Sequence, residues 1–225
     1  MLTGPDFHER HVLDDGTEVT LRHIRPADAA EMQRGFARLS RSSRYLRFQG
    51  VVNELSPEML RYLTTVDGQD HVALVATRRD AGGAEVGLGV ARVVRVHDDP
   101  CAGEVALTVL DEAQHKGLGR ALSVAIARAA LERGMHRLEG PILSDNGPVR
   151  GLLEEVGASV RREGSEMSFE VDLDPPASLA GPRARLEAAA RKLARALSPN
   201  AWFASGRTAC ASADPPTTAP KVPTT

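Results

Sequence analysis

Cysteine is scarce in this chain. Cys101 and Cys210 are the only two among 225 residues, and they lie far apart in sequence without forming a C-x-x-C pair. This usage argues against a disulfide framework and against a cysteine-ligated zinc site, and it fits a reducing compartment. We expect no metal cofactor.

Long apolar runs and an excess of charge are also absent. No uncharged apolar stretch approaches the roughly 18–20 residues of a membrane helix, and residues 1–12 lack the apolar core of a signal peptide. The formal net charge of −2 gives no reason to expect nucleic acid as a partner. The sequence therefore predicts a soluble cytoplasmic protein without a transmembrane segment.

The most informative feature that is present is the segment 104–120. Its first half has the alternation of a half-buried strand, formed by Val105, Leu107 and Val109. A glycine-bearing loop follows, and then apolar residues recur at helical spacing from Leu118 onward. A glycine loop between a strand and a helix N-terminus favours phosphate, because unpaired N–H groups and the positive end of the helix dipole meet there.

Three phosphate-binding patterns compete for this loop. The P-loop string G-x-x-x-x-G-K-[ST] does not occur in the chain. The dinucleotide fingerprint G-x-G-x-x-G/A fails because Leu122 stands at its third small position, and several strand-like runs precede the loop. The pattern Q-x-x-G-x-G fits at Gln114, Gly117 and Gly119. This segment strongly resembles the acyl-CoA pyrophosphate loop of the GNAT acetyltransferase superfamily.

The order of elements along the chain supports that resemblance. Alternating or apolar runs predict strands at Val19–Ile24, His71–Ala76, Val86–Val96, Glu104–Leu110, Arg137–Leu143, Ser159–Arg161 and Met167–Leu173. Helices are predicted from Pro26, from Ser56-Pro57, over 117–133 and over about 147–156. The resemblance implies an α/β GNAT fold, a central mixed and mostly antiparallel sheet with helices on both faces.

More closely, residues 17–173 resemble the GNAT domains of bacterial protein-lysine acetyltransferases. The matching segments are Thr20-Leu21-Arg22, Ile24-Arg25-Pro26-Ala27-Asp28, Leu39-Ser40, Arg44-Tyr45-Leu46-Arg47-Phe48, Leu55-Ser56-Pro57, Asp67 and 71–76. We therefore expect one acetyltransferase domain over residues 1–174. A composition change then predicts a Pro-rich linker at 175–182, a basic amphipathic helix at 183–198 and a disordered tail at 199–225.

Glu104 is the candidate general base. It opens the central strand, on the face opposite Val105 and Leu107, and lies several residues before the phosphate loop. A lysine-type amine has a reference pKa of about 10.4, so its attack on a thioester at neutral pH needs a proton acceptor. Many members of the superfamily carry a glutamate at this strand position, and the alternative is a solvated or Arg-paired strand-end glutamate.

The resemblance also implies the residues that bind acetyl-CoA, the expected co-substrate. The strand would bind the pantetheine arm through Leu107, Thr108 and Val109, with an N–H near Val109 for the oxyanion. The loop would bind the pyrophosphate through Gln114, His115, Lys116, Gly117, Leu118, Gly119 and Arg120, and Asn146 would contact the CoA arm. The tyrosine that protonates the thiolate in many members is replaced by Leu153, so this role is unassigned.

The predicted function is acetyl transfer from acetyl-CoA to a primary amine, with a protein lysine as the acceptor on subfamily resemblance. Arg44, Tyr45 and Arg47 fall in the segment that borders the acceptor cleft in such folds, although a solvated basic face is an alternative. Two other functions stay open. One is a small-molecule amine acetyltransferase, and the other is a non-catalytic acyl-CoA-binding regulatory module.

Overall fold

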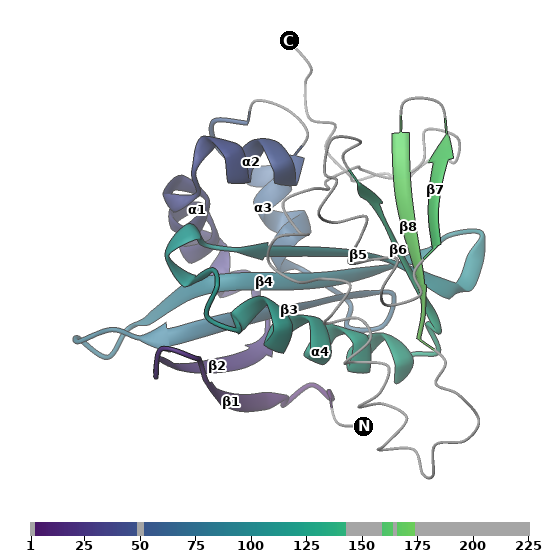
Figure 1. Cartoon of the computed structure of the whole chain (residues 1–225). Helices are drawn as coiled ribbons and strands as arrows, with labels where there is room; N and C mark the ends of the chain where they lie inside the picture. Colours follow the sequence, from purple (N-terminus) through teal and green to yellow (C-terminus); the bar gives the residue numbers. More distant parts are fainter. Residues whose placement is uncertain (1–2, 49–51, 143–158, 164–165, 174–225) are drawn as a thin grey trace.

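A single eight-stranded sheet organises the protein (Figure 1). The computed structural model describes residues 3–48, 52–142, 159–163 and 166–173. The strands are β1 (His8–Val12), β2 (Glu18–His23), β3 (His71–Arg79), β4 (Glu85–Val96), β5 (Asp99–Val109), β6 (Arg137–Ile142), β7 (Ser159–Glu163) and β8 (Glu166–Asp172). Their order in the sheet is β1-β2-β3-β4-β5-β6-β8-β7. The predicted fold class is confirmed.

One parallel pairing joins two antiparallel halves of this sheet. Strands β1 to β5 pair antiparallel in sequence order, and β6, β8 and β7 form a second antiparallel set. The two sets meet where residues 102–104 of β5 run parallel to residues 137–139 of β6. In Figure 1 β7 and β8 stand steeply to β3, β4 and β5. The sheet therefore divides into two halves that diverge beyond this short pairing.

The helices cover both faces of the sheet. They are α1 (Ala29–Arg38), α2 (Arg41–Phe48), α3 (Pro57–Thr64) and α4 (Leu118–Leu131), with 3₁₀ turns at Pro26–Asp28 and Asp111–Ala113. As predicted, Ser56 caps α3 by accepting a hydrogen bond from the N–H of Met59 at 3.2 Å, and Pro57 takes the first helical position. Within the described residues, no helix has the length and apolar character needed to cross a membrane.

One face of the sheet packs on α4 and forms the main core. The inward residues of β3, β4 and β5 are apolar on this face, and the α4 side chains that meet them include Leu118, Leu122 and Ile126, all fully buried. Gly103 allows this approach, because a Cβ there would lie 2.6 Å from Val93 Cγ2 and 2.9 Å from Met135 Sδ. This face supplies most of the apolar burial that stabilises the fold.

The opposite face carries polar side chains and is covered by α1 and α3. Residues directly opposite each other in an antiparallel pair share a face, so the pairing of Arg92 with Ala106 and of Val94 with Glu104 puts both charged residues here. A smaller apolar cluster under the helices closes this side, formed by Phe36, Leu39, Val52, Leu55, Leu63 and Leu110. The two faces of one sheet thus differ sharply in chemistry.

The predicted strands are confirmed to within a few residues at their ends, except that β5 begins five residues early, at Asp99. Strand β1 and helix α2 were not predicted. The sequence of β1, His-Glu-Arg-His-Val, has one apolar residue, Val12, and this residue is 69% exposed. Backbone pairing with β2 therefore holds this edge strand in place. Helix α2 is polar, and Ser40 starts it by accepting a hydrogen bond from the N–H of Ser43 at 3.1 Å.

The helix predicted over about 147–156 and the segments predicted beyond residue 174 lie outside the described residues.

The close packing at Gly103 predicts the effect of a single methyl group. Gly103→Ala should lower the free energy of unfolding by about 1–3 kcal/mol, because Val93 and Met135 must move to admit the Cβ. Gly35→Ala is the matched control, since a Cβ at Gly35 in α1 meets nothing within 4 Å and removes a glycine from a helix. We expect the control to gain about 0.5–1 kcal/mol. Urea unfolding measures both, and an undiminished stability of Gly103→Ala would contradict this packing.

Candidate functional site

The loop between β5 and α4 has the backbone of an anion-binding site. His115 has a φ of 58° and Gly117 a φ of 84°, so two residues of the loop adopt left-handed conformations. Gly117 occupies the N-cap position of α4, and no side chain caps the helix there. The first intrahelical hydrogen bond runs from the N–H of Ala121 to the carbonyl of Gly117 at 3.1 Å. The N–H groups of residues 118–120 are thus available to an anion.

Two side chains of the loop, those of Gln114 and Lys116, contact other parts of the protein. The side-chain amide of Gln114 donates to the carbonyl of Val109 at 3.1 Å, which fixes the loop to the end of β5. The ammonium of Lys116 lies 2.9 Å from the carboxylate of Asp15 in the β1–β2 turn. Gly119 is helical and buried in the first turn of α4, without the positive φ of Gly117. Its backbone N–H, and not its φ, is what it offers to a ligand.

The remaining loop residues divide by exposure. Leu118 is fully buried in the main core, so only its backbone faces the loop. His115 and Arg120 are exposed. The loop can therefore hold an anion with backbone N–H groups and add the positive charge of Arg120.

Strand β5 leads from this loop to Glu104 along the gap between the sheet halves. The parallel pairing with β6 covers residues 102–104, and within the described residues no strand pairs with the same edge of β5 beyond Glu104. The side chains of Leu107 and Val109 are buried toward α4, whereas Thr108 lies on the opposite face. Among the described residues, the β6-facing backbone edge of 105–108 therefore has no strand partner, and the carbonyl of Val109 accepts from Gln114.

Glu104 lies where β5 and β6 separate, directly opposite Glu139 in the parallel register. Burial, reinforced by the negative charge of Glu139 and opposed by the positive charge of Arg47, raises the pKa of Glu104 to about 7. No hydrogen-bond donor among the described residues occupies the Glu104 carboxylate. A carboxylate with these properties can accept a proton near neutral pH.

Two arginines accompany Glu104 on this face of the sheet. Arg92 of β4 is 5% exposed, donates to the carbonyl of Leu63 at 2.7 Å and contacts the ring of His71. Burial lowers the pKa of His71 to about 3, so its imidazole is neutral. Arg47 of α2 is close enough for its charge to act on both Arg92 and Glu104. An arginine inside the apolar run of β4 was the signal that could have found Arg92 in the sequence.

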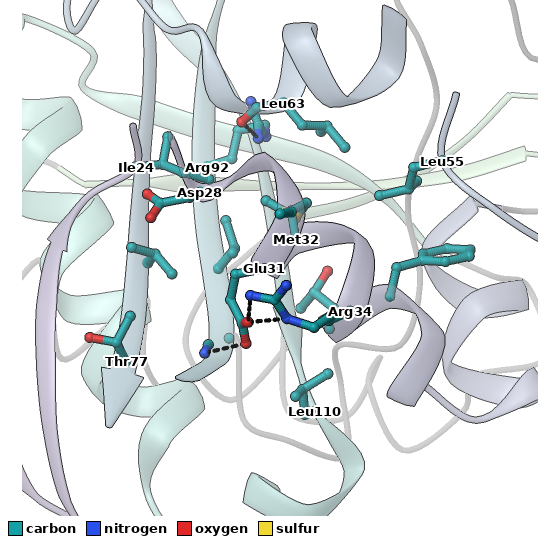
Figure 2. A pocket seen from close by; sticks show the side chains of 18 of the residues that line it. Ile24, Asp28, Glu31, Met32, Arg34, Leu55, Leu63, Thr77, Arg92 and Leu110 are labelled. Carbon is teal, nitrogen blue, oxygen red and sulfur yellow. Dashed lines mark hydrogen bonds and ion pairs between the residues drawn. The ribbon is translucent and has the colours of Figure 1, made fainter. Parts of the chain in front are cut away.

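A cavity of about 260 Å³ lies between this face of the sheet and helices α1 and α3. Arg47 and Arg92 both line it, together with Ala106 and Thr108 of β5. Figure 2 shows Arg92 close to Leu63. Its other walls are largely apolar, formed by Ile24, Met32, Phe36, Leu39, Leu55, Leu63, Val75, Val90 and Leu110. The cavity thus reaches the part of β5 that adjoins Glu104.

The three predicted acceptor-site residues Arg44, Tyr45 and Arg47 have different surroundings in the structure. The Arg44 guanidinium donates to the carbonyls of Leu39 at 3.0 Å and Ala37 at 2.8 Å, so it closes the C-terminal end of α1. Tyr45 is 53% exposed, and Arg47 alone of the three lines the cavity. Asn146, the remaining predicted contact, lies outside the described residues, as does Leu153.

Comparison with known proteins agrees with this geometry. A family model described as an acetyltransferase (GNAT) domain matches residues 18–159. The acetyltransferase Pat of Mycolicibacterium smegmatis is 33% identical over 156 residues, which are 69% of this chain and 46% of Pat. The chain thus spans about half the length of that relative. Acetyltransferase PA5475 of Pseudomonas aeruginosa is 28% identical over 151 residues, 67% of this chain and 80% of that protein.

Among solved structures, the GNAT domain of the S. lividans protein PAT superposes with a TM-score of 0.65 at 28% identity. The match covers 73% of this chain and 96% of that domain. The region matched by the family model contains Glu104, the edge of β5 and the whole loop between β5 and α4. The chain therefore belongs to the GNAT acetyltransferase family, whose members take their acetyl group from acetyl-CoA.

Proposed function

We propose that this protein transfers an acetyl group from acetyl-CoA directly to the primary amine of a protein lysine, with Glu104 as the general base. The observation that carries the proposal is a carboxylate of raised pKa at the point where β5 separates from β6. A non-catalytic acyl-CoA-binding module needs no such group, and perturbed carboxylates gather at catalytic sites. The relationship to Pat supports a protein acceptor.

The phosphate loop and Glu104 are spaced for this reaction. The backbone N–H groups of residues 118–120 would hold the pyrophosphate, and Arg120 would add charge. From Val109 to Glu104, five residues of strand span roughly 17 Å at about 3.3 Å per residue. The pantetheine arm would follow the open edge of β5 over this length and hydrogen-bond to residues 107–109. Its thioester would then lie near Glu104.

We assign each step of the acetyl transfer to a group of the protein or to water. Glu104 accepts a proton from the acceptor ammonium, directly or through a water molecule, which frees the amine to attack the thioester carbonyl. A backbone N–H of the open β5 edge that lies beside the thioester stabilises the oxyanion that forms. The C–S bond then breaks, and the thiolate takes its proton from water, because the position of the usual tyrosine holds Leu153.

Replacing the base should lower turnover without affecting co-substrate binding. Glu104→Gln should reduce kcat/KM about 10²- to 10⁴-fold, the usual contribution of a general base. In the wild type, kcat/KM should fall as the pH drops below about 7, since protonated Glu104 cannot accept a proton. The variant should lose this pH dependence and keep its Kd for CoA. Thiol release and calorimetry measure the two quantities, and an unchanged pH profile in Glu104→Gln would exclude this residue as the base.

The charges around Glu104 predict the direction in which its pKa moves. Glu139→Gln removes a repelling carboxylate and should lower the pKa of Glu104, whereas Arg47→Gln removes an attracting cation and should raise it. Titration of the Glu104 side-chain carboxyl by ¹³C NMR measures its pKa in the wild type and in both variants. Shifts of the same sign in both variants would contradict the arrangement.

The N-terminal end of α4 can be tested with two glycines of similar backbone conformation. Gly117 has a φ of 84° and a Cβ there would lie 3.2 Å from Asp14 Oδ2, whereas Gly134, beyond the other end of α4, has a φ of 77° and open space around it. Both alanine variants should lose about 1 kcal/mol of stability, because a side chain is strained at positive φ. Calorimetry should show weakened CoA binding in Gly117→Ala alone. Equal CoA affinity in the two variants would remove the loop from the binding site.

A further inference from the structure

The guanidinium of Arg92 is buried without a counter-ion among the described residues. It is 5% exposed, and its hydrogen-bond partners are the neutral imidazole of His71 and the carbonyl of Leu63. No carboxylate of the described residues lies within ion-pair distance of it. Arg47 adds a second positive charge nearby. A buried cation in this state is costly unless an anion comes to it.

Two other arginines that line the same cavity, Arg22 and Arg34, each have a carboxylate partner. Arg22 is held by the carboxylates of Asp28 at 2.8 Å and Glu85 at 2.7 Å. Arg34 pairs with Glu31 at 2.8 Å, as Figure 2 shows, and its side chain is 66% exposed. These charges are neutralised by the protein itself. Unlike Arg22 and Arg34, Arg92 lines the cavity without a carboxylate partner among the described residues, so it can bind an anion that enters the cavity.

The position of Arg92 relates this anion site to the acceptor amine. Arg92 lies opposite Ala106, which is two residues from Glu104 on the same face of β5. Two residues of strand span roughly 6.6 Å at about 3.3 Å per residue. One molecule can therefore present its amine to Glu104 and a negative group to Arg92. The apolar walls of the cavity would exclude water from this contact and strengthen it.

We propose that Arg92 and the cavity it lines form a subsite for a carboxylate carried by the acceptor, so that amines with a nearby carboxylate are the preferred substrates. This deepens the proposed function and rests on Glu104 lying at the site of transfer. The guanidinium fork matches a carboxylate through paired N–H donors. The carboxylate can belong to an acidic residue beside the acceptor lysine of a protein or to a small amino acid.

Two matched acceptor pairs test the preference and identify the source of the carboxylate. The first is a lysine peptide with a neighbouring Glu and the same peptide with Gln, and the second is lysine and lysinamide. The carboxylate member of at least one pair should have a kcat/KM about 10- to 100-fold higher, as expected for a hydrogen-bonded charged group. Equal values within both pairs would overturn the proposal.

Substitution of Arg92 then tests the residue itself. Arg92→Met removes a desolvated charge while keeping an unbranched side chain, so the protein should remain folded, which circular dichroism checks. The variant should lose the preference within the discriminating pair. Arg61→Met is the control, because Arg61 of α3 does not line the cavity and its side chain is 73% exposed. If Arg92→Met fails to fold, Arg92→Lys retains the charge but loses the fork, and the preference should shrink.

A binding measurement separates this proposal from the proposed function. Calorimetry with glutarate, a dicarboxylate that has no amine to acetylate, should show binding to the wild type and to Arg61→Met, and at least tenfold weaker binding to Arg92→Met. Binding that does not depend on Arg92, or no binding to the wild type, would overturn the subsite. Arg92-dependent binding in a protein that acetylates no acceptor would leave the subsite standing and reject the acetyl transfer.

Discussion

The separation of β5 from β6 is the constraint on which the site depends. The two strands pair over residues 102–104 of β5 and then diverge, so one edge of the central strand has no strand partner beyond Glu104 among the described residues. Unpaired backbone groups away from water are costly. A ligand that supplies hydrogen bonds along this edge removes that cost. The hydrogen bond from Gln114 to the carbonyl of Val109 holds the loop between β5 and α4 at the far end of the same edge.

The two faces of the sheet separate stability from chemistry. The α4 face is apolar and closely packed, and it holds the central strands in place. The other face accommodates Glu104, Arg92 and a cavity, none of which would be tolerated in a densely packed apolar layer. A rigid layer behind the site allows charged groups to remain at fixed positions, where their mutual fields set their pKa values.

Strand β1 and the β1–β2 turn support the loop between β5 and α4, and both precede the region that the family model matches, which begins at residue 18. Its turn contributes Asp15 to the ion pair with Lys116, and the N–H of Asp14 donates to the carbonyl of Lys116 at 3.1 Å. Glu9 of β1 pairs with Arg128 of α4 at 3.1 Å. An edge strand with little apolar content thus contributes to the position of α4.

The sequence by itself determined the features that depend on neighbouring residues. The alternation of β5, the cap at Ser56 and the Q-x-x-G-x-G loop are local signals, because strand period, cap chemistry and glycine conformation act over a few positions. Only the tertiary structure decided that Lys116 pairs with Asp15 and that Arg44 hydrogen-bonds to the C-terminal end of α1. It also decided that Arg47, Arg92 and Glu104 lie close together. These depend on which segments, distant in sequence, pack together. Burial then sets their charges, and burial is a property of the assembled fold.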